Sequence, residues 1–393
     1  MIALLLGLLL NAGSANAADA AVKPPVEIYG YAKLDLAWDD SRMSTGNFAR
    51  WVEAEDVNRN DSQFSLTANE SRLGIRINGP ELGGAKSRGL MEADFYGGGV
   101  ENKAVPMMRH AYAEVSWPAW DFAFLGGQTW DVQGPLNPPT LNVNVLWGAG
   151  NIGYRRPQLR MTKGVEVAGS RIELAVAAVR TIAQSTTFFT GDTGADAGFP
   201  SGEARLAVTF PACKGQKATI GVGGHLGQEE WDKAKYGLPR YFRTWSAVVD
   251  LLLPVCEKLQ LKGEGWMGEN LSAYNCGIYQ GLDGLGSGSL LKWEETAKLV
   301  DTIRSKGAWA SLTAGPYKYW KYAIGAGIDD PDNRDLKYAG DKTRNRTVFG
   351  TITYDITSST TVGVEVSDWV TEYYAKARNA EALRVQASLI QRF

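Results

Sequence analysis

The chain has 393 residues, a formal net charge of −2 and an aromatic content of 10%, including 13 Trp and 16 Tyr. This nearly balanced charge excludes the basic surface that a nucleic-acid partner requires, so none is expected. A chain of this length usually forms two or three soluble domains, but a β-barrel of the same length is a single domain.

Residues 1–17 have the features of a secretory signal peptide. The apolar run over residues 2–10 precedes Ala15-Asn16-Ala17, a typical cleavage signal. This run is far shorter than the roughly 20 residues of a membrane-spanning helix. The alternative, a buried N-terminal helix, lacks an amphipathic pattern and an N-cap. We expect a signal peptide over 1–17, a short segment over 18–25 and a barrel over 26–393, because a chain without spanning helices can cross a membrane only as a closed barrel.

From residue 26 onward, apolar and polar residues alternate with a period of two. Ile28, Leu34 and Leu36 share one parity, whereas Lys33 and Asp35 share the other. A helix would scatter these apolar residues around its circumference, so the pattern indicates a strand with one apolar and one polar face.

The same pattern recurs to the end of the chain and predicts sixteen strands. The expected ranges are 26–39, 63–78, 87–96, 107–117, 121–130, 158–168, 171–182, 202–210, 217–228, 240–252, 257–268, 307–315, 317–329, 343–356, 360–374 and 381–393. An even number of antiparallel strands is typical of bacterial outer-membrane barrels. The predicted fold class is therefore all-β, a transmembrane antiparallel β-barrel of 16 strands.

The lengths of the connections support this prediction, because barrels of this kind alternate long outer loops with short inner turns. The connections 40–62, 131–157, 183–201 and 269–306 are long, and each follows an odd-numbered strand. The connections after even-numbered strands are short; they are 118–120, 169–170, 211–216, 253–256 and 358–359.

The third outer connection, 131–157, is expected to fold inward and narrow the lumen. Its prolines limit backbone freedom, and its leucines are available for burial. The alternative is a mobile surface loop. The residues assigned to this constriction are Asp131, Pro135, Asn137 and Pro138.

The chain ends at Phe393, which closes an alternating strand over 381–393. A terminal Phe in this position is the assembly signal of outer-membrane barrels. The barrel-assembly machinery is therefore an expected partner, together with outer-membrane lipid.

Several short segments, in this order and at this spacing, resemble the DcaP-like trimeric porin family. They are Tyr29-Gly30-Tyr31-Ala32-Lys33-Leu34-Asp35, Ser71-Arg72-Leu73-Gly74-Ile75, Glu92-Ala93-Asp94-Phe95-Tyr96-Gly97, Arg109-His110-Ala111-Tyr112, Gly127-Gln128-Thr129-Trp130 and Arg304-Ser305-Lys306-Gly307-Ala308-Trp309-Ala310. The resemblance implies a homotrimer of 16-stranded barrels in the outer membrane of a Gram-negative-type bacterium. It also implies passage of small anionic organic molecules such as dicarboxylates.

Arginines on the predicted lumen parity favour an anion preference, since the guanidinium fork suits carboxylates. The candidate pore-lining residues are Arg72, Arg76, Arg109, Arg155, Arg156, Arg160 and Arg171, together with the acidic Glu92 and Asp94. The alternative is that carboxylates of the same parity pair with these arginines and cancel much of their field.

Cys213 and Cys256 occur in matching contexts near two consecutive short turns. A disulfide between them is expected if the chain reaches an oxidising compartment, with Cys276 unpaired. The alternative is three free thiols.

Two other function classes remain open. An outer-membrane barrel enzyme would need a nucleophile beside His110 or His225, and the sequence places no Ser or Asp motif near either. A secreted carbohydrate-binding β protein would use the many Trp as stacking platforms.

No metal or cofactor is expected, because the aspartates of the outer loops lack the spacing of a calcium loop.

Overall fold

The computed structural model describes residues 25–58, 61–99, 103–182, 194–231, 240–283, 300–338, 340–376 and 378–393. The expected signal peptide over 1–17 lies outside the described residues, and so do residues 18–24 of the expected N-terminal segment.

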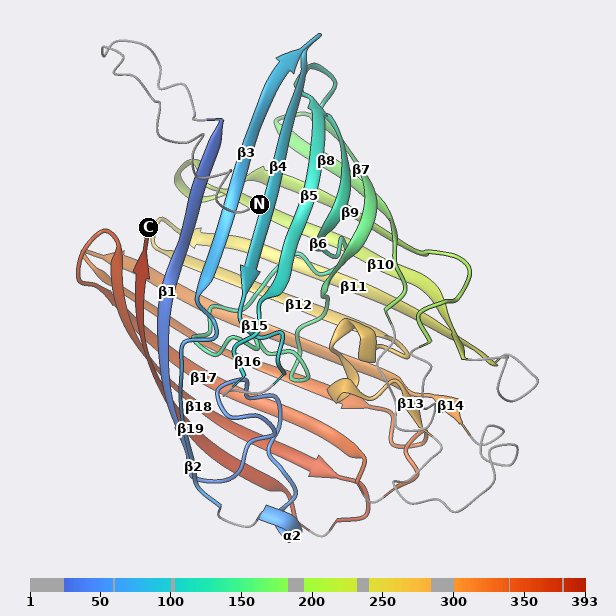
Figure 1. Ribbon diagram of the computed structural model, residues 1–393, viewed down its shortest axis with the longest axis vertical. Coiled ribbons are helices and arrows are strands. Elements are labelled where there is room, and N and C mark those ends of the chain that lie inside the picture. Colours follow the sequence, from blue (N-terminus) through green and yellow to red (C-terminus); the bar gives the residue numbers. More distant parts are fainter. Residues whose placement is uncertain are drawn as a thin grey trace.

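The described strands form one closed antiparallel sheet (Figure 1). Its strands are β1 (Val26–Asp39), β2 (Gln63–Thr67), β3 (Arg72–Leu82), β4 (Ala85–Asp94), β5 (Met107–Trp117), β6 (Phe122–Trp130), β7 (Arg155–Val167), β8 (Ser170–Val179), β9 (Ser201–Pro211), β10 (Lys217–Trp231), β11 (Arg240–Cys256), β12 (Leu259–Glu269), β15 (Arg304–Tyr317), β16 (Trp320–Pro331), β17 (Lys342–Asp355), β18 (Thr360–Tyr373) and β19 (Ala380–Arg392). Outside it, the described residues form a small sheet of β13 (Leu282–Asp283) and β14 (Asp301–Thr302) and the one-turn helix α2 (Glu55–Asn58). They also form four 3-10 turns, η1 (Pro118–Trp120), η2 (Cys213–Gly215), η3 (Ser272–Tyr274) and η4 (Gly277–Tyr279). The barrel closes where β1 pairs with β19, so no edge strand remains.

The sheet has 17 strands, but β2 and β3 occupy a single position in the barrel. Asp35–Asp39 of β1 pair with β2, and Val26–Tyr31 pair with β3. The predicted strand 63–78 is thus interrupted at residues 68–71, where the Ser71 amide donates to the Ala68 carbonyl at 2.9 Å in a tight turn. With this pair counted once, the predicted 16-stranded barrel is confirmed.

The two faces of the barrel wall reverse the burial pattern of a soluble protein. Apolar residues of one parity are exposed, including Leu159 at 58% and Ile324 at 62%. Charged residues of the other parity are buried, including Asp35 at 1% and Arg384 at 0%. An apolar outer band and a polar interior are typical of membrane barrels. Among the described residues, no helix is long and apolar enough to cross a membrane.

Short turns lie at one end of the barrel and long connections at the other, as predicted. The turn between β3 and β4 consists of Gly83 and Gly84, whose φ angles of +59° and +78° are accessible to glycine at little cost. The predicted turn at 253–256 is wrong by a few residues, because β11 continues to Cys256 and the chain reverses at residues 257–258.

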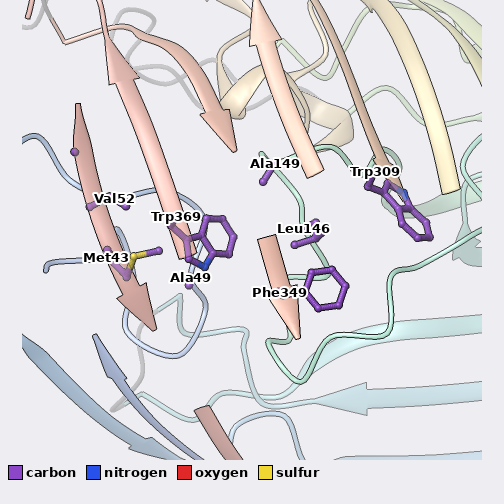
Figure 2. Packing of buried hydrophobic residues seen from close by; sticks show 10 residues of the cluster. Met43, Ala49, Val52, Leu146, Ala149, Trp309, Phe349 and Trp369 are labelled. Carbon is purple, nitrogen blue, oxygen red and sulfur yellow. The ribbon is translucent and has the colours of Figure 1, made fainter. Parts of the chain in front are cut away.

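A hydrophobic cluster joins two outer connections to the inner face of the wall (Figure 2). Met43, Ala49 and Val52 come from the connection after β1, and Leu146 and Ala149 come from the connection after β6. They pack against wall residues of β15, β17 and β18, namely Trp309, Phe349 and Trp369. The two connections are therefore held next to each other.

The expected disulfide between Cys213 and Cys256 is absent, and all three cysteines are free thiols. The reason is the strand register. In the pairing of β10 with β11, Thr219 lies opposite Leu252. If this pairing continued four residues further toward the short turns, Cys256 would lie opposite Gly215, which is two residues from Cys213. Cys256 therefore does not lie directly opposite Cys213, which is the arrangement that the disulfide prediction assumed.

We therefore expect three titratable thiols per chain in protein denatured without reductant. In folded protein, a water-soluble maleimide should modify Cys256, which is exposed, long before Cys276. Cys276 is fully buried, and burial also raises the pKa of its thiol. Labelling followed by peptide mass spectrometry measures both rates. Cys276→Ser should remove only the slowly modified thiol and leave the labelling rate of Cys256 unchanged. A single titratable thiol in the denatured protein would contradict the absence of the disulfide.

Candidate functional site

A cavity of about 610 Å³ lies between the barrel wall and five outer connections, those after β1, β4, β6, β8 and β12. The wall contributes residues of β3, β4, β5, β6 and β7, and the connections contribute residues within 45–50, 96–99, 137–154 and 273–279 together with Ile182. Its charged lining residues are Arg50, Glu70, Arg72, Glu92, Asp94, Arg109 and Arg155. It is therefore a water-accessible space that contains several charged side chains and is flanked by the connection after β6.

Carboxylates of the wall hold this connection by accepting hydrogen bonds from its backbone amides. Each carboxylate is buried and belongs to a different strand, β9, β12, β18 or β16. The carboxylate–amide pairs are Glu203 with Val132 (2.7 Å), Glu264 with Leu136 (2.8 Å), Glu365 with Leu141 (2.6 Å) and Asp329 with Gly150 (2.6 Å). A loop amide that would otherwise be buried without a partner is thereby satisfied. The sequence analysis did not identify these acids as contacts of the loop. The alternation along a strand shows which face of the wall a residue occupies, but it does not show which loop amide the residue meets.

The four residues assigned to the constriction have different environments. Asn137 lines the cavity, and its carbonyl accepts a hydrogen bond from Lys262 at 3.3 Å. Pro138 is buried and Pro135 is exposed, and neither lines the cavity. Asp131 is buried at the start of the connection.

Asp131 forms a bidentate ion pair with Arg156, with distances of 2.7 and 2.9 Å. Arg156 also donates to the Ala273 carbonyl at 3.1 Å and lies 3.9 Å from the Tyr274 ring centre. Burial raises the pKa of Asp131, and the Arg156 guanidinium opposes that shift. The prediction that Arg156 lines the pore is wrong, since all of its surroundings are protein and it does not line the cavity.

Arg109 does line the cavity, but its charge is compensated. It donates to Glu92 at 2.7 Å and to Asp94 at 2.8 Å. Arg72 lies 3.8 Å from Glu92 and 5.1 Å from the Tyr31 ring centre. The anticipated pairing of inward arginines with inward acids is therefore realised for Arg109.

The remaining predicted arginines lie away from the cavity. Arg76 pairs with Glu27 at 3.0 Å, and its guanidinium is half exposed. Arg171 forms a bidentate pair with Asp121, at 2.9 and 2.8 Å, beside a short turn. Arg160 donates to Gln158 at 2.9 Å. Lumen parity alone therefore did not identify which arginines line the cavity.

Arg50 and Arg155 are the lining arginines without a carboxylate partner within 4.0 Å among the described residues. Arg50 was not predicted, because the connection after β1 has no alternation that would show where its side chain points. Glu70 was also missed. It lies at the break between β2 and β3, where its carboxylate accepts a hydrogen bond from the buried Lys33.

The barrel brings His225 within 2.7 Å of the Ser246 hydroxyl, a proximity that the sequence spacing does not reveal. The other ring nitrogen lies 2.8 Å from Thr244, where an orienting carboxylate would stand in a catalytic triad. All three side chains are buried.

Within the described part of the chain, no cluster of three or more His, Cys, Asp or Glu residues is arranged to hold a metal ion.

Comparison with known proteins finds similarity at the level of the fold. The outer membrane channel DcaP of Acinetobacter baumannii has 17% identity and a TM-score of 0.72, covering 94% of this chain and 97% of that chain. An anion-selective porin from Comamonas acidovorans has 12% identity and a TM-score of 0.56, with coverages of 94% and 99%. The trimer form of OmpT, an outer membrane protein of Vibrio cholerae, has 12% identity and a TM-score of 0.52, with the same coverages. No protein-family model and no curated protein sequence matches the chain. The resemblance noted from the sequence segments is thus confirmed in the fold.

Breaking the buried pair between Asp131 and Arg156 should destabilise the barrel. Asp131→Asn leaves the Arg156 charge buried without its partner, so we expect a loss of about 3–5 kcal/mol in the free energy of unfolding. The matched control is Asp121→Asn, which breaks the more exposed pair with Arg171 and should cost about 0–1 kcal/mol. Urea unfolding of the refolded protein in lipid vesicles, followed by Trp fluorescence, measures both losses. Equal losses in the two variants would contradict the structural role given to Asp131.

Proposed function

We propose that this chain is an outer-membrane porin of a Gram-negative-type bacterium, a passive channel for small hydrophilic solutes that favours small organic anions such as dicarboxylates. The observation that carries the proposal is the closed barrel with an apolar outer band, buried charged residues on its inner face and an arginine-containing cavity inside. Such a wall suits lipid on one side and water on the other. Enzymatic activity is not part of the proposal.

The connection over 131–157 is proposed to narrow the channel. Its support is the set of hydrogen bonds to acids of four wall strands, which are spread around much of the barrel. The cluster around Leu146 and Ala149 adds packing against β15, β17 and β18. A segment fixed at so many points reduces the open cross-section of the lumen instead of moving freely at the surface.

The anion preference is supported by the charge balance of the cavity lining. Four arginines face three carboxylates there, namely Glu70, Glu92 and Asp94. Glu70 is bonded to Lys33, and the other two are bonded to Arg109. The acids are thus compensated, whereas Arg50 and Arg155 are not. The anion selectivity named for the Comamonas porin is consistent with this preference.

A homotrimer is proposed because the sequence resembles a trimeric family and the fold matches an OmpT structure described as a trimer. Assembly into the membrane is proposed to use the C-terminal strand. Phe393 follows β19 and exchanges two backbone hydrogen bonds of 3.2 Å with Gly30 of β1. Its side chain is 64% exposed and accessible to an assembly factor.

The wild-type channel should give an anion-selective reversal potential in a potassium chloride gradient. Arg155→Ala should lower the ratio of anion to cation permeability by roughly twofold, because it removes an uncompensated charge from the cavity. Arg171→Ala is the control, since that arginine is paired beside a short turn and should leave the ratio unchanged. Planar-bilayer recording measures all three proteins. A cation-selective wild type would overturn the proposed preference.

Trp147→Ala should raise the single-channel conductance by about 1.5-fold, because Trp147 lines the cavity and belongs to the narrowing connection. The matched control is Trp120→Ala at a short turn, where the indole is 65% exposed and lies outside the cavity. Both variants should retain the slower gel migration on heating that is typical of folded barrels. An unchanged conductance in Trp147→Ala would argue against narrowing by this connection.

A further inference from the structure

We infer that residues 43–52, in the outer connection after β1, form a second constriction element of the channel, and that Phe48 is the side chain of this element that limits solute size. The inference rests on the proposed channel. It goes beyond that proposal, because the narrowing is assigned there to residues 131–157 alone.

The wall fixes the backbone of this segment at several points. Four of its peptide groups form hydrogen bonds with side chains of β17, β18 and β19, so the segment lies against the inner face of the barrel. The bonded pairs are the Gly46 carbonyl with Arg384 (2.8 Å), the Arg50 carbonyl with Asn345 (2.7 Å), the Val52 amide with Thr371 (2.9 Å) and the Val52 carbonyl with Tyr373 (2.7 Å).

Apolar packing on one side of the segment leaves its other side toward the cavity. Met43, Ala49 and Val52 are buried in the hydrophobic cluster against the wall (Figure 2). Phe48 is not part of that cluster. Its side chain is half-buried and lines the cavity of about 610 Å³, together with Thr45. The segment therefore packs on the wall with one set of side chains and borders the solute path with another.

Phe48 also contacts the connection after β6. Its ring centre lies 6.4 Å from that of Trp147 and 5.5 Å from that of Tyr96, which follows β4. All three rings line the cavity, and ring pairs at this spacing stabilise one another. The backbones are joined as well, because Asn142 of the connection after β6 donates to the Ala49 carbonyl at 3.0 Å. The two connections thus border the cavity as one element.

The effect of Phe48 on permeation is steric, because its side chain carries no charge. A ring that borders the solute path narrows it for cations, anions and neutral molecules alike. Size selection by Phe48 and Trp147 is therefore separate from charge selection by the arginines. The solutes that this element excludes are bulky molecules of either charge.

Single-channel recording of the refolded protein in planar bilayers tests this role. Phe48→Ala should raise the conductance by about 1.5-fold, because it removes a ring from the cavity. Phe48→Trp should lower the conductance, because it places a larger ring there. The reversal potential in a potassium chloride gradient should keep its wild-type value in both variants, since neither changes a charge. In liposome-swelling assays with neutral sugars, Phe48→Ala should admit larger sugars than the wild type.

Phe64→Ala is the matched control. Phe64 belongs to β2, is 62% exposed on the apolar outer face and lies outside the cavity, so its loss should leave the conductance unchanged. An unchanged conductance in Phe48→Ala, a higher conductance in Phe48→Trp, or an equal rise in Phe64→Ala would each overturn the inference.

Trp147→Ala, recorded beside these variants, separates the inference from the proposal on which it rests. A rise in Trp147→Ala without a rise in Phe48→Ala defeats only the second constriction element. The absence of a rise in both variants defeats the narrowing by residues 131–157 as well. A wild-type protein that forms no channel defeats the proposed function itself.

Discussion

Closure of the sheet between β1 and β19 is the constraint on which the rest of the structure depends. In lipid, every backbone amide and carbonyl must find a partner within the protein, and a ring of paired strands achieves this without an edge. Tyr31–Asp39 pair with Arg384–Arg392 over the whole contact. Once the ring is closed, each strand has one face toward the outside and one toward a shared interior. The period-two pattern of the sequence is the consequence.

The interior then has to accommodate many charged groups. Arg384 is fully buried and donates to both oxygens of Asp39 at 2.9 Å, and Lys33 is buried beside Glu70 and Asp35. Other acids, such as Glu365, are satisfied by amides of the connection after β6 and not by cations. The connection after β6 and the acids of the wall therefore depend on each other. The connection supplies backbone N–H donors to the buried carboxylates, and the carboxylates supply acceptors to the buried amides.

This arrangement also explains why only some of the inward arginines keep an uncompensated charge. An arginine that faces the interior is neutralised wherever an acid lies within reach, as Arg109 and Arg156 are. Arg50 and Arg155 are held by aromatic rings instead, which stabilise a cation without adding a compensating charge. Whether an inward arginine is paired with an acid is therefore decided by its neighbours and not by its parity.

The sequence by itself determined the fold class, the number of strands in the barrel, the alternation of long and short connections and the face of each strand. These depend on local periodicity and on turn residues, which neighbouring positions encode. Only the tertiary structure decided the break between β2 and β3, the absence of a disulfide between Cys213 and Cys256, and the partners of each arginine. Register, height along the barrel and the path of the outer connections bring together residues far apart in the chain. Arg50 and Arg155 line the same cavity for that reason: Asn345 of β17 donates to the carbonyl of Arg50 in the connection after β1, whereas Arg155 begins β7, and no local pattern records that they meet.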